Sequence, residues 1–196
     1  MTMSTPIHDV FPHVRIIMGI VVGLGITRLL VGSARFVQHP GREKPSAVHL
    51  AWVISMLLML AHFWWWEFWL YDIGDWVFSL YIFLIGYTVA LFLLCALLYP
   101  DDIREYKNYE DYFLSRRKWF FGLLALVFVF DIADTLWKGE EHLLSFGPEY
   151  PIRAGVYIVL CVAAMGIANR RFHQVFAAAN LIYQISFILR QFDRLT

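Results

Sequence analysis

The stretch WVFSLYIFLIGYTVALFLLCALLY, residues Trp76–Tyr99, decides the fold because it contains no Asp, Glu, Lys, Arg or His. A bilayer core about 30 Å thick is crossed by roughly 20 residues of α-helix, which rises about 1.5 Å per residue. Five further apolar stretches meet or approach that length: Val10–Val37, Ser46–Tyr71, Tyr112–Trp137, Ile152–Ala168 and Phe172–Phe192. The sequence therefore predicts an all-α fold, an integral membrane bundle of six transmembrane helices with short loops.

Composition supports a single membrane domain. The 196 residues are 60% hydrophobic and only 16% charged, so residues 1–196 form one six-helix transmembrane domain with nothing left for a soluble one. The net charge is zero and no Lys/Arg-rich run occurs, which argues against nucleic-acid binding. Membrane lipids are the expected surroundings.

The distribution of positive charge predicts the orientation. With the N-terminus outside, ten Lys and Arg residues fall on the inner side and five on the outer side. Short loops rich in Lys and Arg stay on the cytoplasmic side of a membrane. We therefore expect both termini outside.

Six ionisable residues fall in the outer part of the predicted bundle. They are Glu67, Asp131, Asp134, Arg15, Arg153 and Arg190. Charges in hydrocarbon need a partner or water, so these residues form either a salt-bridge network between helices or an outer vestibule that binds an ion or polar solute. Asp134 can pair with Lys138 at i,i+4, which leaves Asp131 as the deepest acid without a local partner.

Arg28 lies within the first span, roughly 13 Å from its inner end. No other span carries a carboxylate at that depth. The guanidinium must therefore reach the inner headgroups, bind carbonyl oxygens, or hold an anion or lipid phosphate.

The sixth span carries a polar stripe of four residues, His173, Asn180, Gln184 and Gln191. Their spacing of about 3.6 residues keeps them within a narrow arc of the helix. Such a stripe faces protein or water. It either holds helices together by hydrogen bonds or lines a pore.

Three histidines, His49, His62 and His173, are the haem candidates, and His49 and His62 are 13 residues apart on one helix. A dihaem site needs two helices that each supply two histidines in register, and that pattern is incomplete. No HExxH, GxSxG, CxxC or phosphate-binding loop occurs. We expect no enzyme, no cofactor and no metal, with a haem-binding redox protein as the remaining alternative.

Two features favour a homo-oligomer. Gly19-x-x-x-Gly23 in the first span allows close approach of another backbone, and the sixth span has a surplus of hydrogen-bonding groups. Self-association through either helix is therefore expected.

Three stretches together carry a resemblance. Gly23-Leu-Gly-Ile-Thr-Arg28, Leu98-Tyr-Pro-Asp-Asp102 and Arg116-Arg-Lys-Trp-Phe-Phe-Gly122, which runs on to Asp131-Ile-Ala-Asp134, resemble a group of uncharacterised bacterial multi-pass membrane proteins. The resemblance implies a bacterial inner-membrane location and no activity. It also suggests that Arg28 and Asp131 belong to motifs of that group.

Two functions fit these features. One is a small channel or transporter for an ion or small polar solute, with a polar route formed by the outer carboxylates, Asn180, Gln184 and Arg28. The other is a non-conducting scaffold or sensor subunit whose polar groups hold the bundle together. A polar chain from face to face favours the first, and a dry, closed core favours the second.

Overall fold

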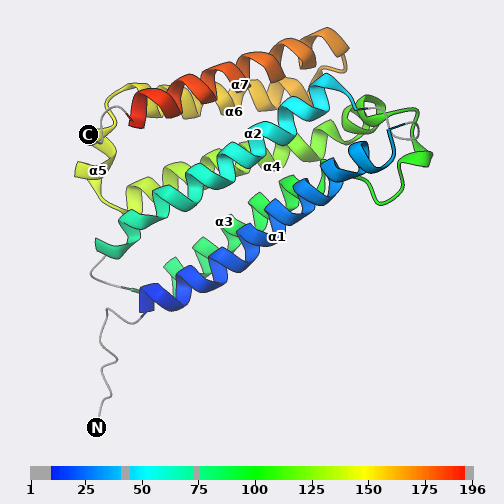
Figure 1. Cartoon of the computed structure of the whole chain (residues 1–196). Helices are drawn as coiled ribbons and strands as arrows, with labels where there is room; N and C mark the ends of the chain where they lie inside the picture. Colours follow the sequence, from blue (N-terminus) through cyan, green and yellow to red (C-terminus); the bar gives the residue numbers. More distant parts are fainter. Residues whose placement is uncertain (1–9, 41–44, 73–75, 193–196) are drawn as a thin grey trace.

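The computed structural model describes residues 10–40, 45–72 and 76–192, and this part of the chain is a bundle of α-helices without strands (Figure 1). Its helices are α1 (Val10–Gln38), α2 (Ala47–Trp66), α3 (Phe78–Ala96), α4 (Tyr109–Trp137), α5 (Glu140–Ser145), α6 (Glu149–Gly166) and α7 (Arg170–Phe192). All but α5 are long and apolar enough to cross a membrane. The predicted all-α bundle with six spans is confirmed.

Helix ends differ from the predicted spans by a few residues, for local reasons. Helix α4 begins at Tyr109 because the Asn108 side chain accepts a hydrogen bond from the Asp111 N–H, which satisfies a backbone donor at the helix start. Helix α2 ends in a 3₁₀ segment, Glu67–Asp72. The short helix α5 lies in the connection before α6 and was not predicted.

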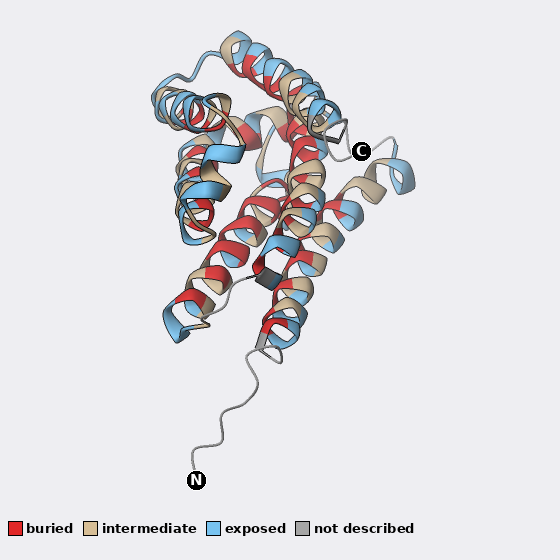
Figure 2. Cartoon of the chain, turned by 90° about the vertical axis from the view of Figure 1, so that its left-hand side faces the viewer, coloured by how far each residue is buried: buried red, intermediate tan, exposed pale blue. Residues whose placement is uncertain are grey.

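The six long helices pack as three pairs, α1 with α3, α2 with α7, and α4 with α6 (Figure 1). Contacts between α3 and α4 and between α1 and α2 join the pairs into one bundle. Large apolar side chains remain exposed on the outside, such as Ile20 at 59% on α1 and Val159 at 68% on α6 (Figure 2). Soluble monomeric proteins rarely expose so much apolar surface, whereas a surface that faces lipid is normally apolar. The exposed surface therefore supports a multi-pass membrane protein.

An aromatic layer fills the bundle between α2, α4 and α7. Trp52 is 1% exposed, and its ring packs against those of Phe113, Phe120, Phe121 and Phe176 at centroid distances of 5.1–6.4 Å. These five side chains, called the aromatic layer below, are buried and closely packed at this level of the bundle.

Close packing on α1 places Arg28 beside the chain that follows α3. A Cβ built on Gly32 would clash with the Tyr99 ring, so only glycine fits there without movement. Arg28 Nη2 donates to the Tyr99 carbonyl oxygen at 3.0 Å and to Asp101 Oδ1 at 2.7 Å. The expectation that no acid reaches Arg28 was therefore wrong, because the acid lies in a connection rather than in a span.

The two glycines of the expected self-association motif have different surroundings. A Cβ on Gly19 would come within 2.9 Å of the Trp64 ring, whereas Gly23 has nothing within 4 Å. Gly19 is therefore covered within the chain, and Gly23 alone is open to a second copy. Self-association stays a prediction.

Gly32→Ala and Gly23→Ala test the close packing of α1 as a matched pair. We expect Gly32→Ala to cost about 1–3 kcal/mol of unfolding free energy because the methyl group overpacks the Tyr99 ring. Gly23→Ala should be neutral or stabilise by up to about 1 kcal/mol, since alanine favours helix and meets open space. Reversible denaturation in detergent measures both values. Equal stability of the two variants would contradict the packing.

Thiol labelling tests the predicted orientation. Lys107 precedes α4 and Ser145 ends α5, and both side chains are exposed, whereas the native Cys95 and Cys161 are buried. Lys107→Cys should be shielded from an impermeant thiol reagent in intact cells, and Ser145→Cys should react, because positive charge keeps the Lys107 loop inside. The unsubstituted protein measures the background. The opposite pattern would invert the topology.

Candidate functional site

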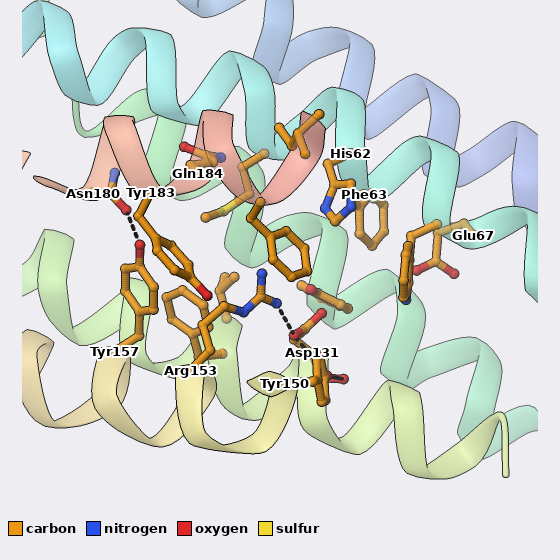
Figure 3. Close-up of a pocket in the computed structure, with 17 residues that line it drawn as sticks. His62, Phe63, Glu67, Asp131, Tyr150, Arg153, Tyr157, Asn180, Tyr183 and Gln184 are labelled. Carbon is orange, nitrogen blue, oxygen red and sulfur yellow. Dashed lines mark hydrogen bonds and ion pairs between the residues drawn. The ribbon is translucent and has the colours of Figure 1, made fainter. Parts of the chain in front are cut away.

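A cavity of about 80 Å³ lies among α2, α4, α6 and α7, toward the end of the bundle where α5 is found (Figure 3). We call it the α5-end pocket. Its wall carries six ionisable or amide side chains, His62, Glu67, Asp131, Arg153, Asn180 and Gln184, together with four tyrosines. Rings of Trp66, Tyr183 and Phe187 fill the spaces between them. The volume suits a few water molecules, an ion or a solute of a few heavy atoms.

Asp131 and Arg153 meet in this pocket from α4 and α6 (Figure 3). Arg153 Nη2 lies 3.8 Å from Asp131 Oδ2, which is an ion pair but too long for a hydrogen bond. The Tyr150 hydroxyl donates to the same Oδ2 atom at 2.9 Å. The guanidinium stacks 4.1 Å from the Phe187 ring centroid, and its buried Nε has no hydrogen-bond partner. The pocket therefore contains an arginine with donors free for a ligand.

A second group of charges lies at the ends of α2 and α4. Lys138 Nζ is 2.6 Å from Asp134 Oδ2 and 3.5 Å from Glu67 Oε1. The three side chains are 2%, 1% and 4% exposed respectively, and we call them the Glu67–Lys138–Asp134 cluster. The predicted Asp134–Lys138 pair is confirmed. Glu67 Oε2 and Asp134 Oδ1 are buried without a hydrogen-bond partner.

The expected network of three acids and three arginines is only partly formed. Arg153 alone of the three arginines pairs with one of those acids, Asp131. Arg190 binds Glu149 at 2.7 Å, and the Arg15 guanidinium lies 4.2 Å from the Phe68 ring centroid. Lys138 pairs with the other two acids, Asp134 and Glu67.

Four polar side chains form a hydrogen-bonded chain beside the pocket. Ser55 Oγ donates to Gln184 Oε1 at 2.7 Å and accepts from Asn180 Nδ2 at 2.8 Å. The Tyr157 hydroxyl donates to Asn180 Oδ1 at 2.9 Å. These bonds join α2, α6 and α7, so the predicted polar stripe holds helices together at this level. Gln191 has its side chain outside the described residues.

Each of the three histidines named as haem candidates has different contact partners. His49 Nε2 is 2.6 Å from the Leu98 carbonyl oxygen, and His173 Nε2 is 2.8 Å from that of Ile167. His62 packs against the Trp66 and Phe187 rings. Across the described ranges, no group of three or more His, Cys, Asp or Glu side chains is placed to hold a metal ion.

The fold gathers most of the candidate site residues and leaves one apart. Glu67, Asp131, Asn180 and Gln184 line one pocket, with Asp134 joined to Glu67 through Lys138. Arg28 is bound elsewhere, to the connection after α3. Sequence reasoning missed Tyr150 and the contact between Lys138 and Glu67, because Tyr150 and Lys138 lie just beyond the predicted spans.

Comparison of the chain with protein-family models, curated proteins and solved structures found no match. The chemistry of the pocket is therefore argued from its own geometry.

Lys138→Met tests the electrostatic role of the Glu67–Lys138–Asp134 cluster. It should cost about 3–5 kcal/mol of unfolding free energy at neutral pH, because two buried acids lose their cation. Arg104→Met is the control, since the Arg104 side chain is 73% exposed in its pair with Asp102 and its loss should leave the unfolding free energy almost unchanged. Detergent denaturation of the two variants gives both values. A Lys138→Met loss no larger than that of the control would show that the cluster is not held by its ammonium.

Proposed function

We propose that the protein binds a small ion or polar solute in the α5-end pocket and transports it across the bacterial inner membrane. One observation carries the proposal. A carboxylate and a guanidinium from different helices stand 3.8 Å apart in a cavity, and the guanidinium retains unpaired donors. Intramembrane ionisable groups that face a cavity are typical of solute and ion pathways. Positive charge outside the spans supports an outer location for this end of the bundle.

The aromatic layer favours a carrier over an open channel. Ser55, Asn180 and Gln184 lie beside the pocket. Trp52 and its four phenylalanine neighbours pack closely at the next level of the bundle, farther from α5. A site open toward one face and closed toward the other is the arrangement that alternating access requires. Transport then needs the helices around Trp52 to move.

The pocket offers both signs of charge to a solute. Arg153 donors suit a carboxylate, phosphate or halide, and Asp131 suits a cation or an amine. The nearby rings of Phe187 and Tyr150 stack against the guanidinium and hold it in place. A compact charged or zwitterionic solute is the best match to these groups.

A second function, a non-conducting sensor or scaffold subunit, is favoured by the same aromatic layer and by the closed Ser55–Asn180–Tyr157 hydrogen bonds. In that case the pocket binds its solute and the signal passes through a shift of α2 against α7. Binding without flux separates this function from transport.

Reconstitution in liposomes tests transport. The flux of H⁺, Na⁺, K⁺, Cl⁻ and small organic anions is measured in turn, and we expect the protein to carry at least one of them. Asp131→Asn and Arg153→Gln should each lower its flux by about tenfold or more, because each removes one charge of the site. Arg190→Gln is the matched control, since Arg190 binds Glu149 away from the pocket wall and should leave flux unchanged. Liposomes impermeable to every species would sink the transport proposal and favour the sensor.

A further inference from the structure

We propose that the Glu67–Lys138–Asp134 cluster is a proton-binding site that holds one proton on the Glu67 carboxyl group. The site is distinct from the Asp131–Arg153 pair, although Glu67 also lines the α5-end pocket. Proton binding does not require that the protein transports anything. Only the use of this proton as a coupling ion rests on the proposed function.

Charge counting is the first argument. The cluster contains two carboxyl groups and one ammonium, so it carries one excess negative charge when all three groups are ionised. The cation in the wall of the adjoining pocket, Arg153, is already paired with Asp131. A single proton makes the cluster neutral.

Burial is the second argument. Glu67, Asp134 and Lys138 side chains are at most 4% exposed, so water does not balance the excess charge. One oxygen of each acid, Glu67 Oε2 and Asp134 Oδ1, is buried with no hydrogen-bond partner. An ionised carboxylate in that position lacks the donors that normally stabilise it.

The two distances assign the proton to Glu67. Lys138 Nζ lies 2.6 Å from Asp134 but 3.5 Å from Glu67, so the ammonium stabilises the ionised form of Asp134 more strongly. Glu67 therefore holds the proton, and its Oε2 atom has no hydrogen-bond partner that would stabilise the ionised form.

Among the residues that the structure describes, the other groups around the cluster add no compensating charge. They are Tyr87 on α3, Asp131 on α4, His142 on α5, and Tyr150 and Arg153 on α6, with His62 on α2. Burial, with a smaller contribution from Lys138, lowers the pKa of His142, so this imidazole is neutral at pH 7. The tyrosines are neutral hydroxyl groups. The nearby Asp131 carboxylate makes a negative charge on Glu67 less favourable.

A proton fits this site better than a metal ion. The Lys138 ammonium already occupies the space between the two acids, within 3.5 Å of both. A metal cation bound to the same oxygens would stand close to that fixed positive charge, whereas a protonated Glu67 is a neutral carboxyl group and adds no positive charge. Proton release would change the charge of the pocket wall from neutral to −1, which links the protonation state to the binding of a charged solute.

Infrared spectroscopy of the whole protein in lipid nanodiscs tests the proposal. At neutral pH we expect a carbonyl band from a protonated carboxylic acid, and ¹³C labelling of glutamate carboxyl groups should shift it. Glu67→Gln should abolish the band. Asp134→Asn should abolish it too, because Lys138 is then free to stabilise ionised Glu67. Glu149→Gln is the matched control and should retain the band, since the Glu149 side chain is 43% exposed and pairs with Arg190.

The outcomes separate this site from the transport proposal. A native protein without the band at neutral pH, or a Glu67→Gln variant that keeps it, overturns the proton site whatever the flux assay shows. A band that persists in a protein with no flux supports the proton site and sinks transport alone. Circular dichroism checks that each variant folds. If Glu67→Gln does not fold, the response of the native band to glutamate or aspartate labelling still decides between the acids.

Discussion

Hydrocarbon cannot solvate a charge, and the rest of this structure depends on that constraint. Each ionisable or strongly polar group within the spans needs a partner supplied by the protein. Lys138 reaches two acids, Arg28 reaches Tyr99 and Asp101, and Asn180 reaches Ser55 and Tyr157. These contacts fix how α1 sits on the end of α3 and how α2 sits on α7. The polar groups thus determine helix registers as well as the site.

Where that pairing is incomplete, polar groups are left that can bind a solute or a proton. Arg153 makes one long ion pair and stacks on rings, yet its Nε donor is unused. The Glu67–Lys138–Asp134 cluster has one acid too many for its single cation. Both defects lie beside the same cavity, and the aromatic layer around Trp52 contributes a tightly packed, uncharged cross-section. A cavity with incompletely paired charges next to a tightly packed aromatic layer suits the proposed binding of a solute.

Several partners come from the chain just beyond the spans. Lys138 follows the last residue of α4, Asp101 lies in the connection after α3, and Tyr150 is in the first turn of α6. Such residues are missed when only residues within the spans are compared by their depth in the membrane. For this reason Arg28 was expected to lack an acid. Long side chains at helix ends can turn back into the bundle and reach groups below them. The Lys138 side chain, 2% exposed beside an exposed Trp137, shows this behaviour.

The sequence by itself determined the membrane fold, because apolar run length and the cost of unpaired backbone in lipid leave only helices of about 20 residues. It also determined the local Asp134–Lys138 pair and the stripe of Asn180 and Gln184, since helical periodicity places those residues on one face. Only the tertiary structure decided that Glu67 also pairs with Lys138, that Arg153 pairs with Asp131 and that Ser55 accepts a hydrogen bond from Asn180. Those contacts join helices far apart in the chain, and they depend on which helices pair and at what register, which no local pattern encodes.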